Sequence, residues 1–381
     1  MIPFSLEMPA AIHFGSGSLE KLAQVFAGFG SRVLLVSGTG SMAGAGGEAA
    51  IEGRLSGCVV HRVICRSIEP TTESLDAVAA SAAGFAPDVI LAVGGGSVLD
   101  TAKGLSALLR YPGPAERFLE GLDGSCPIPG PCLPWVAVPT TAGTGAEATK
   151  NAVVRASRLG VKRSMRSPHL LARAVIVDPE LALSLPVRVT GTSGLDALTQ
   201  LVESYVSRTS TPFVQAIVEG AFPHMVEALR GLATDPRAIR LREAASYGAL
   251  VSGIALANGG LGAAHGFAAA IGGMFEVPHG LACAVLLPHV LRANAEIIED
   301  KIARLGRTLW DASTGITAVA WLSGVVESLL ASYGLSRTLR EYRMPSTSIP
   351  ELAEKSSGSS MRGNPREIGT AERIEILSRV I

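Results

Sequence analysis

Side chains that could bind a metal ion stand in apolar stretches of the second half of the chain. Asp196 and Gln200 lie four residues apart, so on a helix both point to one face. His265 lies in residues 244–275, which contain no Asp, Glu, Lys or Arg, and His279 follows soon after. Together these four residues are a plausible divalent-metal set with one position open for substrate. The alternative is that each histidine is a hydrogen-bonded core residue, and spacing alone favours that alternative.

A glycine-rich turn in the first half has the composition of a phosphate site. Gly95, Gly96 and Ser97 come just behind the apolar run at 89–93 and open a helical pattern. Glycine lets backbone N–H groups approach an anion, and the positive end of the helix dipole points to the same place. A nucleotide is therefore the first ligand to expect. The pattern is neither a spaced-glycine fingerprint nor a Walker loop, and in the alternative interpretation Ser97 and Asp100 only start a helix.

A second loop could clamp the same ligand from the opposite side. Thr140, Thr141 and Thr144 follow the apolar run at 135–138, and their hydroxyl and N–H groups are suited to a pyrophosphate or a ribose. The alternative is a capped turn. Lys162 could neutralise phosphate charge, although a single lysine is more often solvated surface.

The elements that must position these residues change character near the middle of the chain. Up to residue 183, strand-like runs alternate with helical patterns, which predicts a mostly parallel, helix-covered sheet. The predicted strands are 33–36, 59–64, 89–93, 135–138 and 174–177, and the predicted helices are 19–29, 73–85 and 98–109. From residue 184 to 381 we expect only helices, at 195–206, 214–232, 240–257, 281–294 and 318–333. The serine-rich patch at 356–360 is predicted to be a surface loop before a final helix.

Composition narrows the class of protein. The 381 residues carry 33 Lys and Arg against 33 Asp and Glu, so no net field attracts nucleic acid or an anionic membrane. The uncharged stretch at 244–275 is long enough to span a membrane, but its repeated glycines favour a closely packed, buried helix pair. Five cysteines without Cys-x-x-Cys spacing argue against a disulfide framework and against a thiolate zinc site. With no export signal at the N-terminus, we expect a cytoplasmic protein.

Several of these motifs, taken in order, resemble those of the iron-containing, or group III, alcohol dehydrogenase family. The matching segments are 94–103, 139–147, 178–181, 194–198, His265, 278–280, 287–290 and 364–365. The resemblance implies an N-terminal nucleotide-binding domain at 1–183 and a helical metal and substrate domain at 184–381. It also implies a dehydroquinate synthase-like architecture with a divalent metal, Fe²⁺ or Zn²⁺, in the cleft between the two domains.

The resemblance further implies which residues act. The family's metal ligands fall on Asp196, His265 and His279, and its catalytic groups on the same two histidines and Asp100. The cofactor would lie against Gly95, Gly96, Ser97, Thr140, Thr141, Thr144 and Lys162. Hydride would pass between a small alcohol or aldehyde and the nicotinamide, and a homodimer is expected.

The chain departs from the family pattern at two positions. Gln200 stands where relatives offer a fourth, histidine ligand, and an amide oxygen binds transition metals less strongly than imidazole. We therefore expect a metal that is weak, exchangeable or absent, with Gln200 or water in the remaining position. Ala269 replaces a histidine linked to proton transfer, so water or the cofactor ribose would carry the proton.

Cofactor choice rests on the end of the first predicted strand. Many NAD-preferring relatives carry a carboxylate there, whereas this chain has Gly38 in the run 36–41, whose N–H and hydroxyl donors suit a 2′-phosphate. We therefore expect NAD(P), with NADP slightly favoured. Two alternatives stay open: a metal-free reductase similar to maleylacetate reductases, and a catalytically inactive nucleotide-binding protein of the same fold.

Overall fold

The structure is a computed structural model that describes residues 3–42, 48–66 and 69–381. The chain divides into two compact units: Glu7–Ser184, and Leu185–Ile381 together with the short segment that ends at Leu6. The division falls one residue after the predicted domain boundary.

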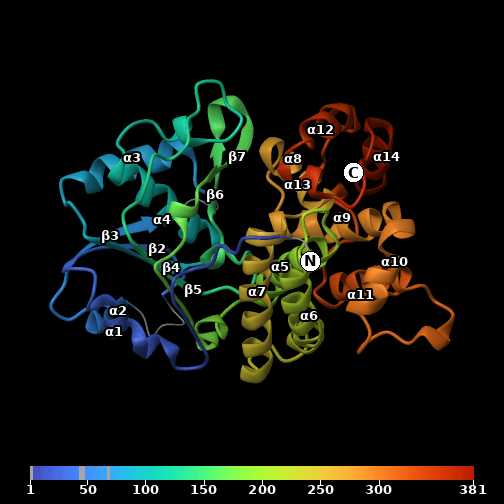
Figure 1. Cartoon of the computed structure of the whole chain (residues 1–381), viewed down its shortest axis with the longest axis horizontal. Helices are drawn as coiled ribbons and strands as arrows, with labels where there is room; N and C mark the ends of the chain where they lie inside the picture. Colours follow the sequence, from blue (N-terminus) through green and yellow to red (C-terminus); the bar gives the residue numbers. More distant parts are fainter. Residues whose placement is uncertain (1–2, 43–47, 67–68) are drawn as a thin grey trace. The chain divides into compact units, whose positions relative to one another are not determined.

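The first unit is built on a six-stranded, wholly parallel sheet with strand order β1-β8-β5-β4-β2-β3 (Figure 1). The strands are β1 (Ile12–Phe14), β2 (Arg32–Gly38), β3 (Val59–Cys65), β4 (Val89–Gly94), β5 (Trp135–Pro139) and β8 (Ala174–Val177). The central strands β4, β5 and β8 are buried along their whole length, which explains why each is a continuous apolar run in the sequence. Five of the six strands were predicted. The sixth, β1, is a three-residue edge strand with too little pattern to predict.

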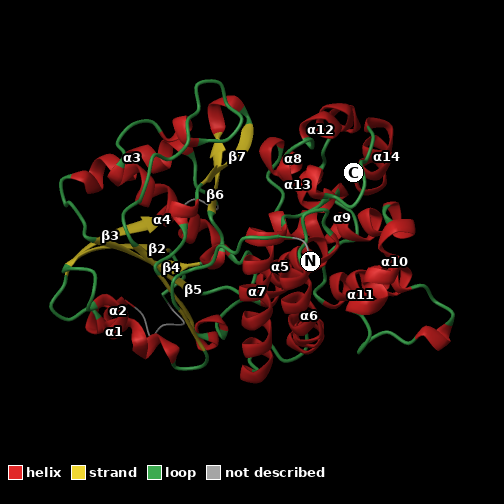
Figure 2. Ribbon diagram, viewed as in Figure 1, coloured by secondary structure: helices red, strands yellow, loops and turns green. Residues whose placement is uncertain are grey.

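Helices cover both faces of this sheet (Figure 2). On one face, Leu22 of α1 (Leu22–Phe26) and Ile51 of α2 (Glu48–Arg54) join the apolar core of the strands. On the other face lie α4 (Gly96–Arg110) and its neighbour α3 (Thr72–Ala83). The helix predicted at 19–29 is shorter, because it begins as a 3₁₀ turn at Ser18–Lys21 and α1 ends at Phe26.

A separate antiparallel hairpin, β6 (Asn151–Ala156) and β7 (Val161–Arg166), packs against α4. Its turn contains Gly160 at φ 60°, a left-handed conformation that favours glycine. The hairpin was not predicted, since Lys162, Arg163 and Arg166 interrupt the apolar alternation of β7.

The second unit is helical, as predicted. Its helices are α5 (Val187–Val206), α6 (Pro212–Leu232), α7 (Ile239–Gly259), α8 (Ala263–Met274), α9 (His279–Ala293), α10 (Ala295–Leu305), α11 (Ala318–Ser332), α12 (Ile349–Lys355), α13 (Ser359–Gly363) and α14 (Thr370–Val380). Helix α5 is the centre of the unit, because it packs against α6, α7 and α9 and is buried almost throughout its second half. The serine-rich patch is exposed at residues 357–359, as expected of a surface loop, but it connects α12 to α13 and does not directly precede the last helix. Ser356 is buried at the end of α12, and α13 starts at Ser359.

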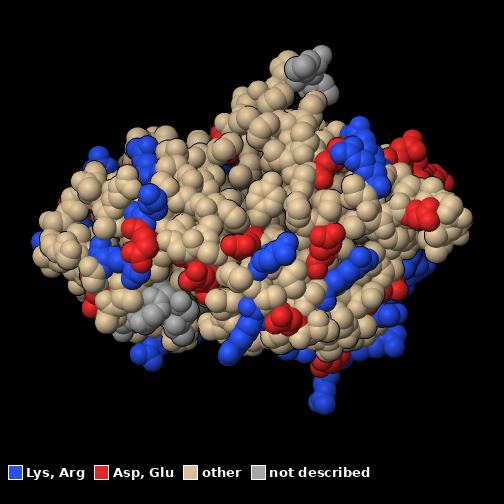
Figure 3. Space-filling model, turned by 90° about the horizontal axis from the view of Figure 1, so that it is seen from below, with Lys and Arg blue, Asp and Glu red and all other residues tan. Residues whose placement is uncertain are grey.

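The uncharged stretch forms α7 and α8, whose axes meet at 97° and most of whose side chains are buried in the unit. Within the described residues, no single helix is long and apolar enough to cross a membrane, although α7 with α8 and α9 with α10 would pass as bent pairs by length and composition. On the face seen in Figure 3, acidic and basic side chains are interspersed among uncharged residues.

Candidate metal centre and phosphate cradle

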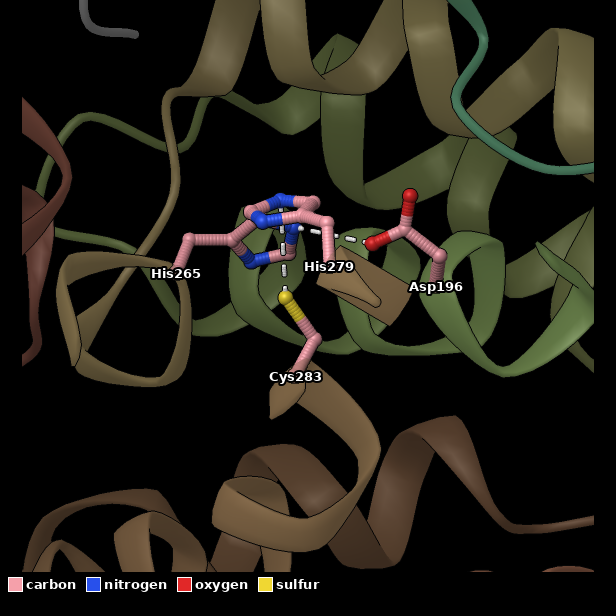
Figure 4. Close-up of side chains that lie close together, drawn as sticks. All are labelled: Asp196, His265, His279 and Cys283. Carbon is pink, nitrogen blue, oxygen red and sulfur yellow. Dashed lines mark hydrogen bonds and ion pairs between the residues drawn. The ribbon is translucent and has the colours of Figure 1, made fainter. Parts of the chain in front are cut away.

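Four side chains of the helical unit direct possible metal ligands to one point (Figure 4). They are Asp196 on α5, His265 on α8, and His279 and Cys283 on α9, with ligand atoms that all lie within 4.8 Å of one another. The Oδ1 of Asp196 is 3.5 Å from the Nε2 of His265. The Sγ of Cys283 is 3.6 Å from the Nε2 of His279. Three of the four residues predicted as metal ligands are thus brought together, and Cys283 joins them.

Glu203 positions His265. Its Oε2 is 2.7 Å from the Nδ1 of His265, and its carboxylate accepts the backbone N–H groups of Gly262 and Ala264 at the start of α8. A carboxylate on Nδ1 fixes the ring so that Nε2 faces Asp196. A β-carbon on Gly262 would lie 2.7 Å from Oε1 of Glu203, so glycine is needed for this approach. Sequence reasoning assigned Glu203 no role, although it is seven residues after Asp196 on the same face of α5.

Gln200 is held away from the cluster. Its Nε2 donates to Oδ2 of Asp196 at 3.2 Å, and its Oε1 accepts from Oγ of Ser252 on α7 at 2.7 Å. Without a bound ion, turning the amide over would set its oxygen against a carboxylate, so the NH₂ end faces Asp196. In this arrangement Gln200, which we expected among the metal ligands, orients Asp196.

Cys283 is a possible metal ligand, although the cysteine spacing was expected to argue against a thiolate zinc site. That expectation considered only pairs of cysteines, whereas Cys283 follows His279 by four residues and so lies on the same face of α9. Gly280 lets α9 reach α5, since a β-carbon there would overlap the carbonyl oxygen of Thr192 and lie 3.0 Å from Cβ of Asp196. The His-x-x-x-Cys spacing was the signal that sequence reasoning could have used.

The electrostatics of the cluster suit a bound cation. Oδ1 of Asp196 and Nε2 of His265 are buried and lie 3.5 Å apart, and neither makes a hydrogen bond of normal geometry within the described residues. Burial alone would raise the pKa of Asp196, but the close approach of His265 and the charges of both histidines hold it below its ordinary value. Burial alone would lower the pKa of His265, but Cys283, Asp196 and Glu203 raise it. Burial raises the pKa of Cys283 to about 12. A divalent ion would satisfy the two orphaned atoms, so the residues present fit one.

In the first unit, the two predicted cofactor loops pack directly against each other. The N–H of Thr140 donates to the carbonyl of Gly94 at 3.0 Å. A β-carbon would lie 3.2 Å from the side chain of Thr141 if placed on Gly95, and 2.7 Å from that of Thr144 if placed on Gly96. Helix α4 begins with Gly95 as its N-cap and has no side-chain cap. Ser97 is therefore not the N-cap, as it would be in the alternative interpretation in which Ser97 and Asp100 only start the helix, and the first N–H groups of the helix could face an anion.

Gly38 lies beside this cradle, at the carboxyl end of β2. Its N–H donates to Oγ of Ser41 at 2.8 Å, and that hydroxyl donates to the carbonyl of Val93 on β4 at 2.7 Å. The ends of β2, β4 and β5 thus gather Gly38, the glycine turn and the threonine loop at one edge of the parallel sheet, which is where ligands bind in such sheets.

Asp100 and Lys162 already have partners in the first unit. Asp100 accepts from Nζ of the buried Lys103 at 3.2 Å and from the N–H of Val153 on β6 at 3.1 Å. Burial raises the pKa of Asp100, against the opposing charge of Lys103. Lys162 forms an ion pair with Glu69. Asp100 therefore helps hold the hairpin to α4, and Lys162 helps hold it to the connection before α3, whatever further role they have.

Comparison with known proteins agrees with this arrangement. Residues 9–179 match the family described as iron-containing alcohol dehydrogenase, and residues 190–381 match the C-terminal part of the Fe-containing alcohol dehydrogenase family. Lactaldehyde reductase of Escherichia coli (strain K12) is 33% identical over 295 residues, which is 76% of each chain. NADPH-dependent butanol dehydrogenase of Clostridium saccharobutylicum is 29% identical, over 100% of this chain and 98% of the relative. The crystal structure of 1,3-propanediol oxidoreductase superimposes with a TM-score of 0.91 at 27% identity and covers 100% of both chains.

Proposed function

Because the chain belongs to the iron-containing alcohol dehydrogenase family and is an alcohol and aldehyde oxidoreductase, we propose that it transfers hydride between NADP and a short-chain alcohol or aldehyde. The observation that carries the proposal is the meeting of Asp196, His265 and His279 in the helical unit, while the other unit has a glycine and threonine cradle. The metal-free alternative accounts less well for three possible ligands, two of them buried, whose donor atoms lie close together.

In the helical unit, Asp196, His265 and His279 would hold the divalent ion that the family implies. When bound, such an ion acts as a Lewis acid that polarises the substrate oxygen and favours the alkoxide form of the alcohol. Glu203 keeps Nε2 of His265 directed to the ion, and Gln200 keeps Asp196 in place. Both side chains work by fixing a ligand that is itself buried, so the site needs little reorganisation when the substrate binds.

In the sheet unit, Gly95, Gly96 and Ser97 would bind the cofactor pyrophosphate at the start of α4, with Thr140, Thr141 and Thr144 opposite them. Nicotinamide supplies or accepts the hydride. Gly38 would face the adenosine ribose, where the absence of a carboxylate removes the repulsion that NADP meets in NAD-specific relatives. The NADPH dependence of the Clostridium saccharobutylicum relative supports the same preference. Asp100 would lie near the reacting end, and Lys162 would screen phosphate charge if it exchanged Glu69 for the ligand.

The substrate is proposed to be small. The relatives described above act, by their names, on lactaldehyde, butanol and 1,3-propanediol. We therefore propose a short aldehyde as the substrate in the reducing direction. The homodimer and the cytoplasmic location stay predictions, to be checked by light scattering and by cell fractionation.

The proposal is tested by following nicotinamide absorbance with purified protein, NADPH or NADH, and lactaldehyde, butanal or 3-hydroxypropanal. We expect turnover with both cofactors and a lower KM for NADPH. Absence of turnover with every pair, by protein supplied with Fe²⁺ or Zn²⁺, would leave the inactive nucleotide-binding protein as the better account.

Gly38→Asp tests the cofactor preference. A carboxylate about 4 Å from a 2′-phosphate costs about 1 to 4 kcal/mol, so the KM for NADPH should rise by about tenfold or more while that for NADH changes little. A β-carbon at Gly38 would be 3.4 Å from Ser41 and Val98, so the fold should tolerate it. Gly38→Asn is the uncharged control and should affect both cofactors alike. Equal losses with Gly38→Asp would place the 2′-phosphate elsewhere.

A further inference from the structure

The proposed metal site contains a sulfur atom, that of Cys283. The family pattern instead has a further nitrogen ligand, which would fall at position 200. We propose that Cys283 is the fourth protein ligand, in place of Gln200, and that the resulting Asp196, His265, His279 and Cys283 set selects Zn²⁺ over Fe²⁺. This inference rests on the proposed function, because it concerns the identity of the ion in the same site.

Two distances within the cluster agree with donors that share one ion, to which the substrate oxygen would add as a further ligand. With metal–sulfur bonds of about 2.3 Å and metal–nitrogen bonds of about 2.05 Å at tetrahedral angles, a sulfur and a nitrogen ligand lie about 3.6 Å apart, and an oxygen and a nitrogen ligand about 3.4 Å apart. The observed separations are 3.6 Å from Cys283 Sγ to His279 Nε2, and 3.5 Å from Asp196 Oδ1 to His265 Nε2. All four donor atoms lie within 4.8 Å of one another (Figure 4).

Two further observations point to a ligand at this place. Asp196 is 2% exposed and His265 is 4% exposed, and each has a buried atom that makes no hydrogen bond of normal geometry within the described residues, on the side where Cys283 lies. In this arrangement the oxygen of the Gln200 amide lies against Ser252 and its NH₂ group faces Asp196, so the amide oxygen does not reach them.

The chemistry of the sulfur atom favours its coordination. Cys283 is completely buried beside the other three donors. On binding, the Cys283 thiol proton would leave to solvent and a metal–sulfur bond would replace the sulfur–hydrogen bond. A thiolate is a softer donor than an amide oxygen, which favours zinc over iron.

Cobalt substitution reads the metal–sulfur bond directly. Full-length protein, stripped by a chelator and loaded with Co²⁺, should show a thiolate-to-cobalt charge-transfer band in the near ultraviolet. Cys283→Ser should lose this band. Two control variants should keep it: Gln200→Ala, and Cys132→Ser, which changes a partly buried cysteine of the other unit.

Competition tests the metal preference. With equal concentrations of Zn²⁺ and Fe²⁺ and without oxygen, the native chain should load mainly zinc, and Cys283→Ser should bind zinc about tenfold or more weakly. A native chain that binds Co²⁺ without the band, or that binds none, would overturn the ligand assignment, and a native chain that loads mainly iron would overturn the zinc preference.

X-ray absorption at the zinc edge keeps the test decisive if Cys283→Ser fails to fold. The native zinc-loaded protein should show one sulfur neighbour at about 2.3 Å beside nitrogen and oxygen neighbours. A shell of nitrogen and oxygen only would contradict the proposal. Turnover with NADPH is measured on the same sample: turnover without a sulfur neighbour overturns only the ligand assignment, and a sulfur neighbour without turnover overturns only the proposed function.

Discussion

At the scale of single residues, Glu203 shows how one buried carboxylate serves fold and site together. It accepts three backbone N–H groups at the start of α8, those of Gly262, Ala264 and His265, and holds Nδ1 of His265. Glu203→Gln would turn NH₂ toward these donors, so we expect metal affinity to fall by about 10- to 100-fold and stability to fall by about 1 to 3 kcal/mol. Chelator competition and thermal unfolding measure the two effects separately.

Glu299→Gln is the matched control for this prediction. Its carboxylate also accepts backbone N–H groups at a helix start, those of Ala318 and Val319, but contacts none of the four clustered ligands. We expect it to lose stability while its metal affinity stays unchanged. If Glu203→Gln likewise lost only stability, Glu203 would be a helix cap and no more.

At the scale of elements, the glycine turn that begins α4 and the threonine loop after β5 pack against each other. A β-carbon on Gly96 would lie 2.7 Å from the side chain of Thr144, so the two loops approach each other this closely only because residue 96 is glycine. We therefore expect Gly96→Ala to weaken NADPH binding by about tenfold or more and to destabilise the protein by about 1 to 3 kcal/mol through overpacking. Calorimetry of NADPH binding and thermal unfolding test both effects.

The double variant Gly96→Ala with Thr144→Ala should regain part of the stability. If the double variant also fully recovered its NADPH affinity, that result would contradict a cofactor role for the Thr144 hydroxyl.

At the scale of the whole molecule, two compact units divide the proposed chemistry between them. A ligand stabilises the segments that bind it, by about 2.7 kcal/mol when its free concentration is one hundred times its Kd. Hydrogen exchange should therefore show the largest protection by NADPH at the ends of β2, β4 and β5, and the largest protection by Zn²⁺ in α5, α8 and α9. Chelated protein without NADPH is the reference, and Zn²⁺ protection centred on the sheet would contradict the proposed metal site.

Local sequence determined the kinds of element and the faces they present. Parallel strands buried on both faces must be continuous apolar runs, so β2, β4, β5 and β8 could be predicted, while the half-exposed hairpin β6 and β7 could not. Helical spacing likewise placed Asp196 and Gln200 on one face, and the order of the motifs indicated the family.

Only the tertiary structure decided which atoms meet. Which donors converge depends on how α5, α8 and α9 cross, and that is set by close approaches at Gly262 and Gly280 that no local pattern encodes. The same packing turned Gln200 toward Ser252 and brought in Cys283. Residue spacing specifies the face of a helix on which a side chain lies, whereas coordination depends on distances between helices, which are settled only when the whole unit packs.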